Sequence, residues 1–305
     1  MKGKNRTFYY ILLVIVLMAL SMTVLLFCQH ELVQQGRERF SDNLLASARE
    51  RSVTMEAAVE SRFSLLESLA DLLYLDDLSQ EQIASMLRAA GASSSFASID
   101  VVDDDSASLQ DSGLSAQQQA AVLRALSGRR AVEHIPSDQA GGEAHFFFAV
   151  PAREAGQVHA VLTGAVSDAA FEPLISYGAY GEESYFFLCD GQGNLVLGSD
   201  NQYFHADKRN LFALLKEAPF EQGADDIAQI QDLMARRESG TLAYSIAQSG
   251  RYAALFPLSI NDWYLFHAVT QDCSCGLKAT SRNAGCMCPN TAAHSTHNAR
   301  STRSH

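Results

Sequence analysis

Residues 8–28 read FYYILLVIVLMALSMTVLLFC, a run of apolar residues that contains no charge. A helix of about 20 such residues rises roughly 1.5 Å per residue and spans the ~30 Å hydrocarbon core of a bilayer. Lys2, Lys4 and Arg6 precede the run, and positive charges on that side favour a cytoplasmic N-terminus. The sequence therefore predicts a single-pass protein of the cell membrane, with residues 1–7 in the cytoplasm and the bulk of the chain outside it.

Two kinds of processed segment are alternatives to an uncleaved anchor. A cleaved signal peptide has an apolar region of about 7–15 residues that ends in small residues, whereas Leu25, Leu26 and Phe27 are bulky. A lipoprotein signal would use Cys28, but Phe27 stands where a small residue is expected. We therefore expect residues 8–28 to remain as a transmembrane helix.

The composition favours a packed, acidic region outside the membrane. About 275 residues follow the apolar run, which suits one or two domains. Hydrophobic residues make up 47% of the chain, which is enough for a core, and the net charge of -12 argues against nucleic acid or anionic lipid as a partner. Cys189 is the only cysteine between residues 29 and 272, so this part cannot form an internal disulfide.

A long helix is predicted from residue 31 to residue 75, where the sequence has no proline. Its apolar residues recur at intervals of mostly three or four, which places them in one stripe along a helix. A helix of roughly 40 residues is ~60 Å long and needs a partner. We expect it either to dock on the domains that follow, as a plain amphipathic core helix, or to form a homodimer with a second copy as a signalling stalk, or both. The stripe consists of Leu44, Ala48, Met55, Val59, Phe63, Leu66, Leu69 and Leu73.

After this helix the sequence follows one plan twice. Ser79 and Gln82 predict a capping box for a short helix that completes residues 31–90. The hydrophobic period then changes from 3.6 to 2, and each of residues 91–175 and 176–272 contains strand candidates, helix candidates and three closing strands in a meander. Neighbouring strands of a meander normally pair antiparallel. We therefore predict an α+β fold in which two tandem PAS-like antiparallel-sheet modules carry helices on one face.

The predicted strands and helices have these limits. The strands are 96–102, 131–135, 145–152 and 157–166 in the first module, and 185–189, 195–198, 240–248, 251–258 and 263–269 in the second. The helices are 114–126, 168–175, 208–218 and 224–238.

Two stretches carry a resemblance to a known family. YFFLCDGQGNLVLGSD at residues 185–200 looks like an opening hairpin, and RYAALFPLSINDWYLFHAV at residues 251–269 looks like closing strands. With one span and a long helix before them, they make residues 31–270 resemble the double Cache (dCache) sensors, which are PAS-like extracytoplasmic domains of bacterial receptors. The resemblance implies a membrane-distal module at residues 91–175 that binds a small ligand, and a membrane-proximal module at residues 176–272. It also implies a second span that leads to a histidine kinase, a diguanylate cyclase or a chemotaxis module.

The candidate ligand-binding residues lie in the distal module. In amino-acid-binding Cache domains an Asp at about the place of Asp168 holds the ligand amine, and those relatives also carry an Arg-x-Trp-Tyr element that this module lacks. His145 and Phe147 lie on a strand expected to face the pocket. Arg129 and Arg130 could hold a carboxylate, because guanidinium binds carboxylates through two parallel hydrogen bonds. The structural alternatives are a helix N-cap for Asp168, and exposed or strand positions for the others.

The sequence contains no recognisable catalytic motif, such as G-x-S-x-G, H-E-x-x-H or a P-loop. Residues 103–105 are three aspartates, but the glycine and glutamate of a calcium loop do not follow. We therefore expect no enzymatic activity, no cofactor and no metal in the folded part. The alternatives to a sensor are a membrane-anchored binding or adhesion protein without a signalling role, and a hydrolase whose nucleophile and base would converge in a pocket.

Residues 273–305 have a different character from the rest of the chain. They contain no acidic residue, and inserting Lys278 and Arg282 at mid-bilayer would cost roughly 2.5–3.5 kcal/mol each, so they cannot form a second span. We expect a disordered tail, with a disulfide or a metal site at its cysteines as alternatives. The tail begins where a sensor would approach its second span, which is typical of a reading-frame change, and the chain is then expected to lack its output module.

Overall fold

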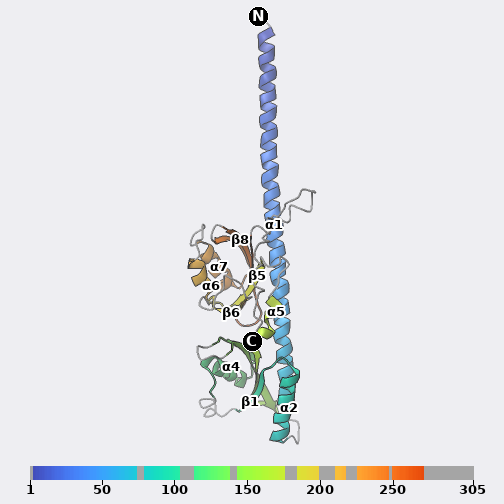
Figure 1. Cartoon of the computed structure of the whole chain (residues 1–305), viewed down its shortest axis with the longest axis vertical. Coiled ribbons are helices and arrows are strands. Elements are labelled where there is room, and N and C mark those ends of the chain that lie inside the picture. The colour runs from blue at the N-terminus through green and yellow to red at the C-terminus, as the bar shows by residue number, and fades with distance from the viewer. Residues whose placement is uncertain are drawn as a thin grey trace, which may run out of the picture.

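A computed structural model of the chain places two sheets side by side along one very long helix (Figure 1). The distal module lies at the end of the helix farthest from the N-terminus, and the proximal module lies between it and the uncovered part of the helix (Figure 1). The predicted tail, 273–305, lies outside the described residues. The structure describes residues 3–73, 79–103, 113–137, 143–175, 184–198, 210–217, 225–246 and 249–270.

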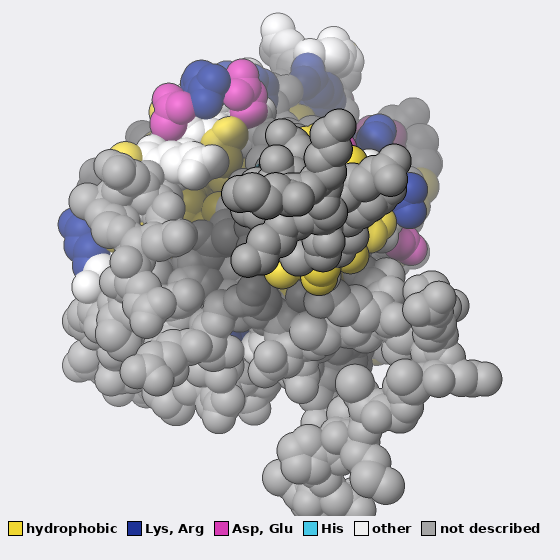
Figure 2. Space-filling model, turned by 90° about the horizontal axis from the view of Figure 1, so that it is seen from above, with side chains coloured by type: hydrophobic (Ala, Val, Ile, Leu, Met, Phe, Trp, Pro, Cys, Tyr) yellow, Lys and Arg dark blue, Asp and Glu magenta, His cyan; other side chains and the backbone are white. Residues whose placement is uncertain are grey.

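The predicted span and the predicted stalk form one continuous helix, α1 (Gly3–Leu73). Apolar side chains of its first half are exposed, with Leu17 at 60% and Phe27 at 67%. Figure 2 looks from the N-terminal end, and yellow hydrophobic side chains gather around this part of the helix. Among the described residues, α1 is the one helix that is long and apolar enough to cross a membrane.

The predicted apolar stripe of α1 is buried along its whole length, from Leu44 at 0% exposure to Leu73 at 9%. It packs on both sheets. The ring of Phe63 stands edge-on to Phe148 of the distal sheet, with 5.2 Å between centroids, and Phe40 does the same with Tyr252 of the proximal sheet at 5.2 Å. The helix therefore docks on the modules that follow it, while the homodimer stays a prediction.

The distal sheet is antiparallel, with strand order β1-β4-β3-β2. The helix α4 (Ala116–Leu126) covers one face and α1 covers the other. Ser79 and Gln82 form the predicted capping box at the start of α2 (Gln80–Ser93), which packs beside β1. The strands are β1 (Ser98–Asp103), β2 (Ala131–Ile135), β3 (His145–Glu154) and β4 (Gln157–Ser167), and η1 (Asp168–Ala170) and α5 (Glu172–Ile175) follow them.

The proximal sheet is also antiparallel, with strand order β6-β5-β9-β8-β7. The helices α6 (Leu211–Glu217) and α7 (Asp225–Arg236) pack on one face, where Cys189 is fully buried, and α1 packs on the other. The predicted α+β class with two antiparallel modules is confirmed, although helices cover both faces because α1 forms the second cover. The strands are β5 (Ser184–Cys189), β6 (Leu195–Gly198), β7 (Gly240–Ile246), β8 (Ser249–Pro257) and β9 (Tyr264–Thr270).

A core substitution in α1 tests the docking. Leu66 is fully buried, and it packs where Gly164 lets β4 come close, since a Cβ at Gly164 would lie 3.3 Å from Leu66 Cδ1. Leu66→Ala should lower the free energy of unfolding by about 2–5 kcal/mol, because it leaves a cavity between helix and sheet. Ser64→Ala, at an exposed position of the same helix, should change it by less than about 0.5 kcal/mol. Denaturant unfolding in detergent micelles measures both, and equal effects would contradict a docked helix.

Candidate functional site

Two cavities lie where the modules meet, and Asn261 lines both of them. The larger, of about 570 Å³, is called the junction cavity here; its walls include Arg124, Glu133 and His134 of the distal module and Asp190, Asn261 and Trp263 of the proximal module. The second, of about 520 Å³, is the stalk cavity; it lies against α1 and includes Glu60 and Arg130. Small-molecule sites typically measure ~300–1,000 Å³, so both have the size of a ligand site.

The turn between β8 and β9 separates the two cavities. Asn261 sits there with φ of 48°, in the left-handed region that Asn tolerates better than most residues. Arg237, just after α7, fixes the turn from behind. Its Nη1 donates to Asn261 O at 3.1 Å and to Asp262 Oδ1 at 2.9 Å, and its Nη2 donates to Leu258 O at 2.6 Å. The turn is thus held rigidly by its own module.

The same turn joins the proximal module to the rest of the molecule. Asn261 Nδ2 donates to Val132 O of β2 at 2.7 Å, and Ser259 N donates to Glu56 Oε1 of α1 at 2.5 Å. Trp263 is 4% exposed. Its ring packs at the junction, 5.8 Å from the ring of Phe146 in β3. One short turn therefore contacts the stalk helix and the distal sheet together.

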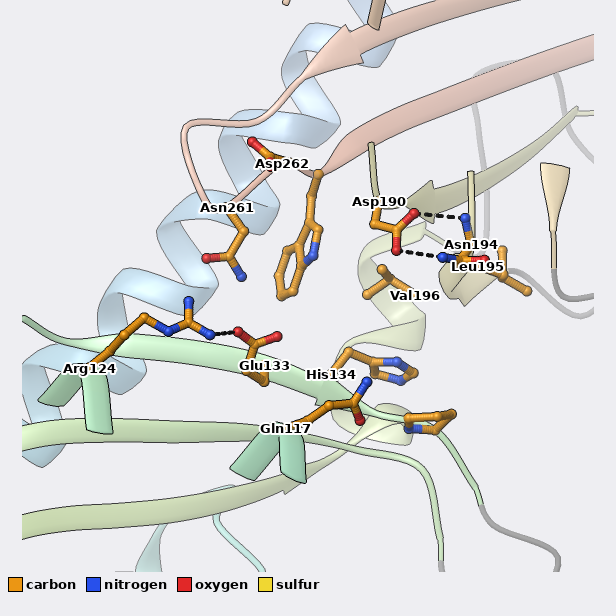
Figure 3. A pocket seen from close by; sticks show the side chains of 12 residues that line it. Gln117, Arg124, Glu133, His134, Asp190, Asn194, Leu195, Val196, Asn261 and Asp262 are labelled. Carbon is orange, nitrogen blue, oxygen red and sulfur yellow. Dashed lines mark hydrogen bonds and ion pairs between the residues drawn. The ribbon is translucent and has the colours of Figure 1, made fainter. Parts of the chain in front are cut away.

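Polar side chains of both modules face one another across the junction cavity (Figure 3). On the distal side, Arg124 of α4 donates to the carboxylate of Glu133 in β2. On the proximal side, Asp190 follows β5 and holds the hairpin turn, because its Oδ1 accepts from Gln192 N at 2.9 Å and Asn194 N at 2.8 Å. Hydrogen bonds within each module therefore hold both groups in place, and groups that are pre-organised in this way lose little entropy when they bind a ligand.

Asp168, the first of the predicted site residues, lies beside the junction cavity. Its Oδ2 is 3.0 Å from Nε2 of His134, which lines that cavity. No hydrogen-bond donor of the described residues reaches its Oδ1, although that atom is buried. The capping role considered for Asp168 belongs to Ser167, whose Oγ accepts from Ala169 N at 3.3 Å.

Arg130 does hold a carboxylate, but the partner is a side chain of α1. Its Nη1 and Nη2 donate to the two oxygens of Glu60 at 2.8 Å and 2.6 Å, and its guanidinium lies 4.6 Å from the centre of the Phe63 ring. The hydrogen bond with Glu60 raises the pKa of Arg130, with a further contribution from the charge of Glu67. This ion pair fastens the distal sheet to the stalk helix at one wall of the stalk cavity.

The remaining predicted residues do not converge on either cavity. Phe147 is 5% exposed and packs under α4, in a cluster with Ala121 and Val122. His145 lies at the start of the same strand, where its Nδ1 is 2.9 Å from Glu143 O, and Arg129 is exposed. Sequence reasoning missed His134, Glu133 and Asn261, because residues that meet only when two modules stack share no local pattern.

Several solved structures have the same arrangement of two sheets along a long helix. The ligand-binding domain of the Pseudomonas aeruginosa amino acid chemoreceptor PctC, in complex with GABA, matches with 20% identity and a TM-score of 0.56 over 75% of this chain and 100% of that chain. The chain has the fold of a chemoreceptor ligand-binding domain. The ligand-binding domain of the Pseudomonas fluorescens chemoreceptor CtaA, in complex with L-isoleucine, matches with 17% identity and a TM-score of 0.57. The match covers 79% of this chain and 96% of that chain.

A third match extends this chemoreceptor fold to another organism. The sensory domain of Campylobacter jejuni Tlp3 with isoleucine bound is 13% identical, with a TM-score of 0.55 over 79% of this chain and 96% of that chain. No family model and no curated protein match the chain. The fold that the dCache resemblance implied is therefore confirmed, while the class of the output module stays a prediction.

His267 marks the contact between α1 and the proximal half of this chemoreceptor fold. It is fully buried on β9, stacks on Phe186 with 3.9 Å between ring centroids, and lies beside the backbone of Leu44 in α1. Burial lowers its pKa from 6.5 to about 3, and the positive charge of Arg51 acts in the same direction. The imidazole is therefore neutral at physiological pH.

This histidine should make the fold sensitive to acid. Between pH 6.5 and pH 3 the unfolded chain binds a proton at His267 and the folded chain does not, so its contribution to stability is complete above pH 6.5 and is lost as the pH falls. The free energy of unfolding should drop by up to about 1.4 kcal/mol per pH unit in this window. His267→Phe should remove that part of the slope, and His159→Phe, at an exposed position, should keep it. Parallel pH profiles for wild type and His267→Phe would contradict the assignment.

Proposed function

We propose that this chain is the extracytoplasmic, ligand-sensing region of a membrane-anchored bacterial receptor. The observation that carries the proposal is the continuity of α1, which runs without a break from an exposed apolar segment to the far end of the distal module. Both sheets dock on this one helix, so a change in either module acts on the element that enters the membrane. The chemoreceptor fold supports the same function.

The proposed ligand is a small polar molecule. The neighbours described above hold GABA, L-isoleucine or isoleucine, and the junction cavity has a volume suited to a molecule of that size. Asp168 remains the best of the predicted contacts, since its Oδ1 has no hydrogen-bond partner among the described residues and its Oδ2 contacts His134, which lines the cavity. Arg130 is the weaker candidate, because Glu60 already occupies both of its terminal nitrogens.

The proposal also includes the orientation of the chain in the membrane and the output module of the receptor. Lys2, Lys4 and Arg6 hold the N-terminus in the cytoplasm, so both modules lie outside. The chain acts by binding and not by catalysis, and the receptor's output is a histidine kinase or a diguanylate cyclase, as the dCache resemblance implies. A homodimer through the exposed side of α1 fits this arrangement.

A ligand screen tests the binding half of the proposal. The full chain in detergent micelles is melted in the presence of amino acids, GABA, amines and organic acids. A ligand of the folded state should raise the melting temperature, since at 100 times its Kd it adds about 2.7 kcal/mol of stability. For an amine ligand, Asp168→Asn should weaken binding by about 1–3 kcal/mol, and the exposed control Arg129→Gln should not. A screen in which nothing stabilises the chain would argue against a small-molecule sensor.

A chimera tests the sensing half. Residues 1–270 replace the sensor and first span of a histidine kinase whose second span and kinase are retained. The ligand found in the screen should change transcription from the kinase's target promoter. A ligand that binds the chain and leaves this output unchanged would favour the alternative of a membrane-anchored binding protein.

A further inference from the structure

We propose that the junction cavity binds a small organic cation, of the class of short alkyl amines and diamines. The inference rests on the proposed function and deepens it, because it names the chemical class of the ligand and places it between the modules. It is carried by the charge of the cavity walls, by their apolar patches, and by the position of the cavity across two modules.

The fixed charges of the cavity leave an excess of one carboxylate. Arg124 neutralises Glu133, and Arg237 neutralises Asp262 from behind the turn. Asp190 accepts three hydrogen bonds from its own hairpin, but the ion pairs of the described residues include none to Asp190. A cavity with this imbalance attracts cations and repels anions.

The uncharged walls favour an organic cation over a metal ion. Leu195 lines the cavity with an apolar side chain that can contact an alkyl chain, and the nearly buried Val196 and Trp263 add apolar atoms to the same wall. The amide oxygens of Gln117 and Asn194 can accept from an ammonium group. Among the residues that the structure describes, no group of three or more His, Cys, Asp or Glu side chains is placed to hold a metal.

The position of the cavity gives the ligand a way to act. Asp190 belongs to the proximal module, whereas Gln117 and Glu133 belong to the distal module, so a bound cation contacts both. A ligand shifts an equilibrium only when it binds one arrangement more tightly than another. A cation between the modules favours the arrangement in which they are close, and the β8–β9 turn conveys that arrangement to α1 through Ser259 and Glu56.

The chain contains its own reporter for occupancy of this cavity. Trp263 is the only tryptophan in the sequence and lines the cavity, so its fluorescence responds to a molecule bound there. The full chain in micelles is titrated with 1,4-diaminobutane, with butanedioate as the probe of equal length and opposite charge, and with calcium chloride. The diamine should change the emission of Trp263 in a saturable manner, and the two other compounds should not.

Three variants locate the effect. Asp190→Asn should weaken diamine binding roughly tenfold or more, because it neutralises the unpaired carboxylate. Gln117→Arg adds a positive charge at an exposed position of α4, where folding is not at risk, and should also weaken binding. Asp232→Asn removes an equal charge from exposed α7, outside the cavity, and should bind like the wild type.

The outcomes separate this inference from the proposed function. Three results would each overturn the cation site. The first is no response of Trp263 to the diamine, and the second is a saturable response to butanedioate or to calcium chloride. The third is that Gln117→Arg and Asp232→Asn bind the diamine with the same affinity. If the ligand screen and the chimera succeed with another compound while Trp263 does not respond to the diamine, the sensing function stands and this assignment fails. If the diamine binds as described and the chimera does not respond to any bound ligand, the site stands and the sensing function fails.

Discussion

The packing of one face of α1 against two sheets is the contact on which the rest of the structure depends. Successive residues of β3 and β5 are buried, so both sheets bury apolar side chains on both faces, and the part of the chain between residues 29 and 272 cannot form an internal disulfide. The largest buried cluster therefore contains Phe63 and Leu66 of the helix together with Phe148 of the distal sheet and Leu265 of the proximal sheet. Burying a large apolar side chain contributes roughly 1.5–3 kcal/mol, so the shared stripe stabilises both modules at once.

Outside the shared core, the surfaces of the two modules that face each other are polar. Apolar contacts between the modules are made at α1, at α5 and around Trp263, and beyond them the facing surfaces carry Glu133, Asp190 and Asn261. Coupling across a protein needs an element with two arrangements that a ligand can bias. The modules share one buried cluster, and beside it the β8–β9 turn and the junction cavity of about 570 Å³ let a bound ligand contact both of them.

Local patterns made most of the fold predictable, and the site much less so. The spacing of Leu44 to Leu73 marked the buried stripe, and Ser79 with Gln82 marked a helix start, because both depend on residues three or four apart. The partner of Arg130 is 70 residues away, and that of Asn261 is 129 residues away. Residue type indicated a carboxylate partner for Arg130, but the structure pairs it with Glu60, and that partner depends on how α1 packs on the distal sheet.

Amide hydrogen exchange of the full chain in detergent micelles tests the central claim, that α1 is a structural part of both modules. Amides of residues 40–73 should exchange as slowly as those of β3 and β8, because global unfolding must expose them together. If residues 40–73 exchange like a free helix while β3 and β8 stay protected, the helix is not docked, and an account built on it is wrong.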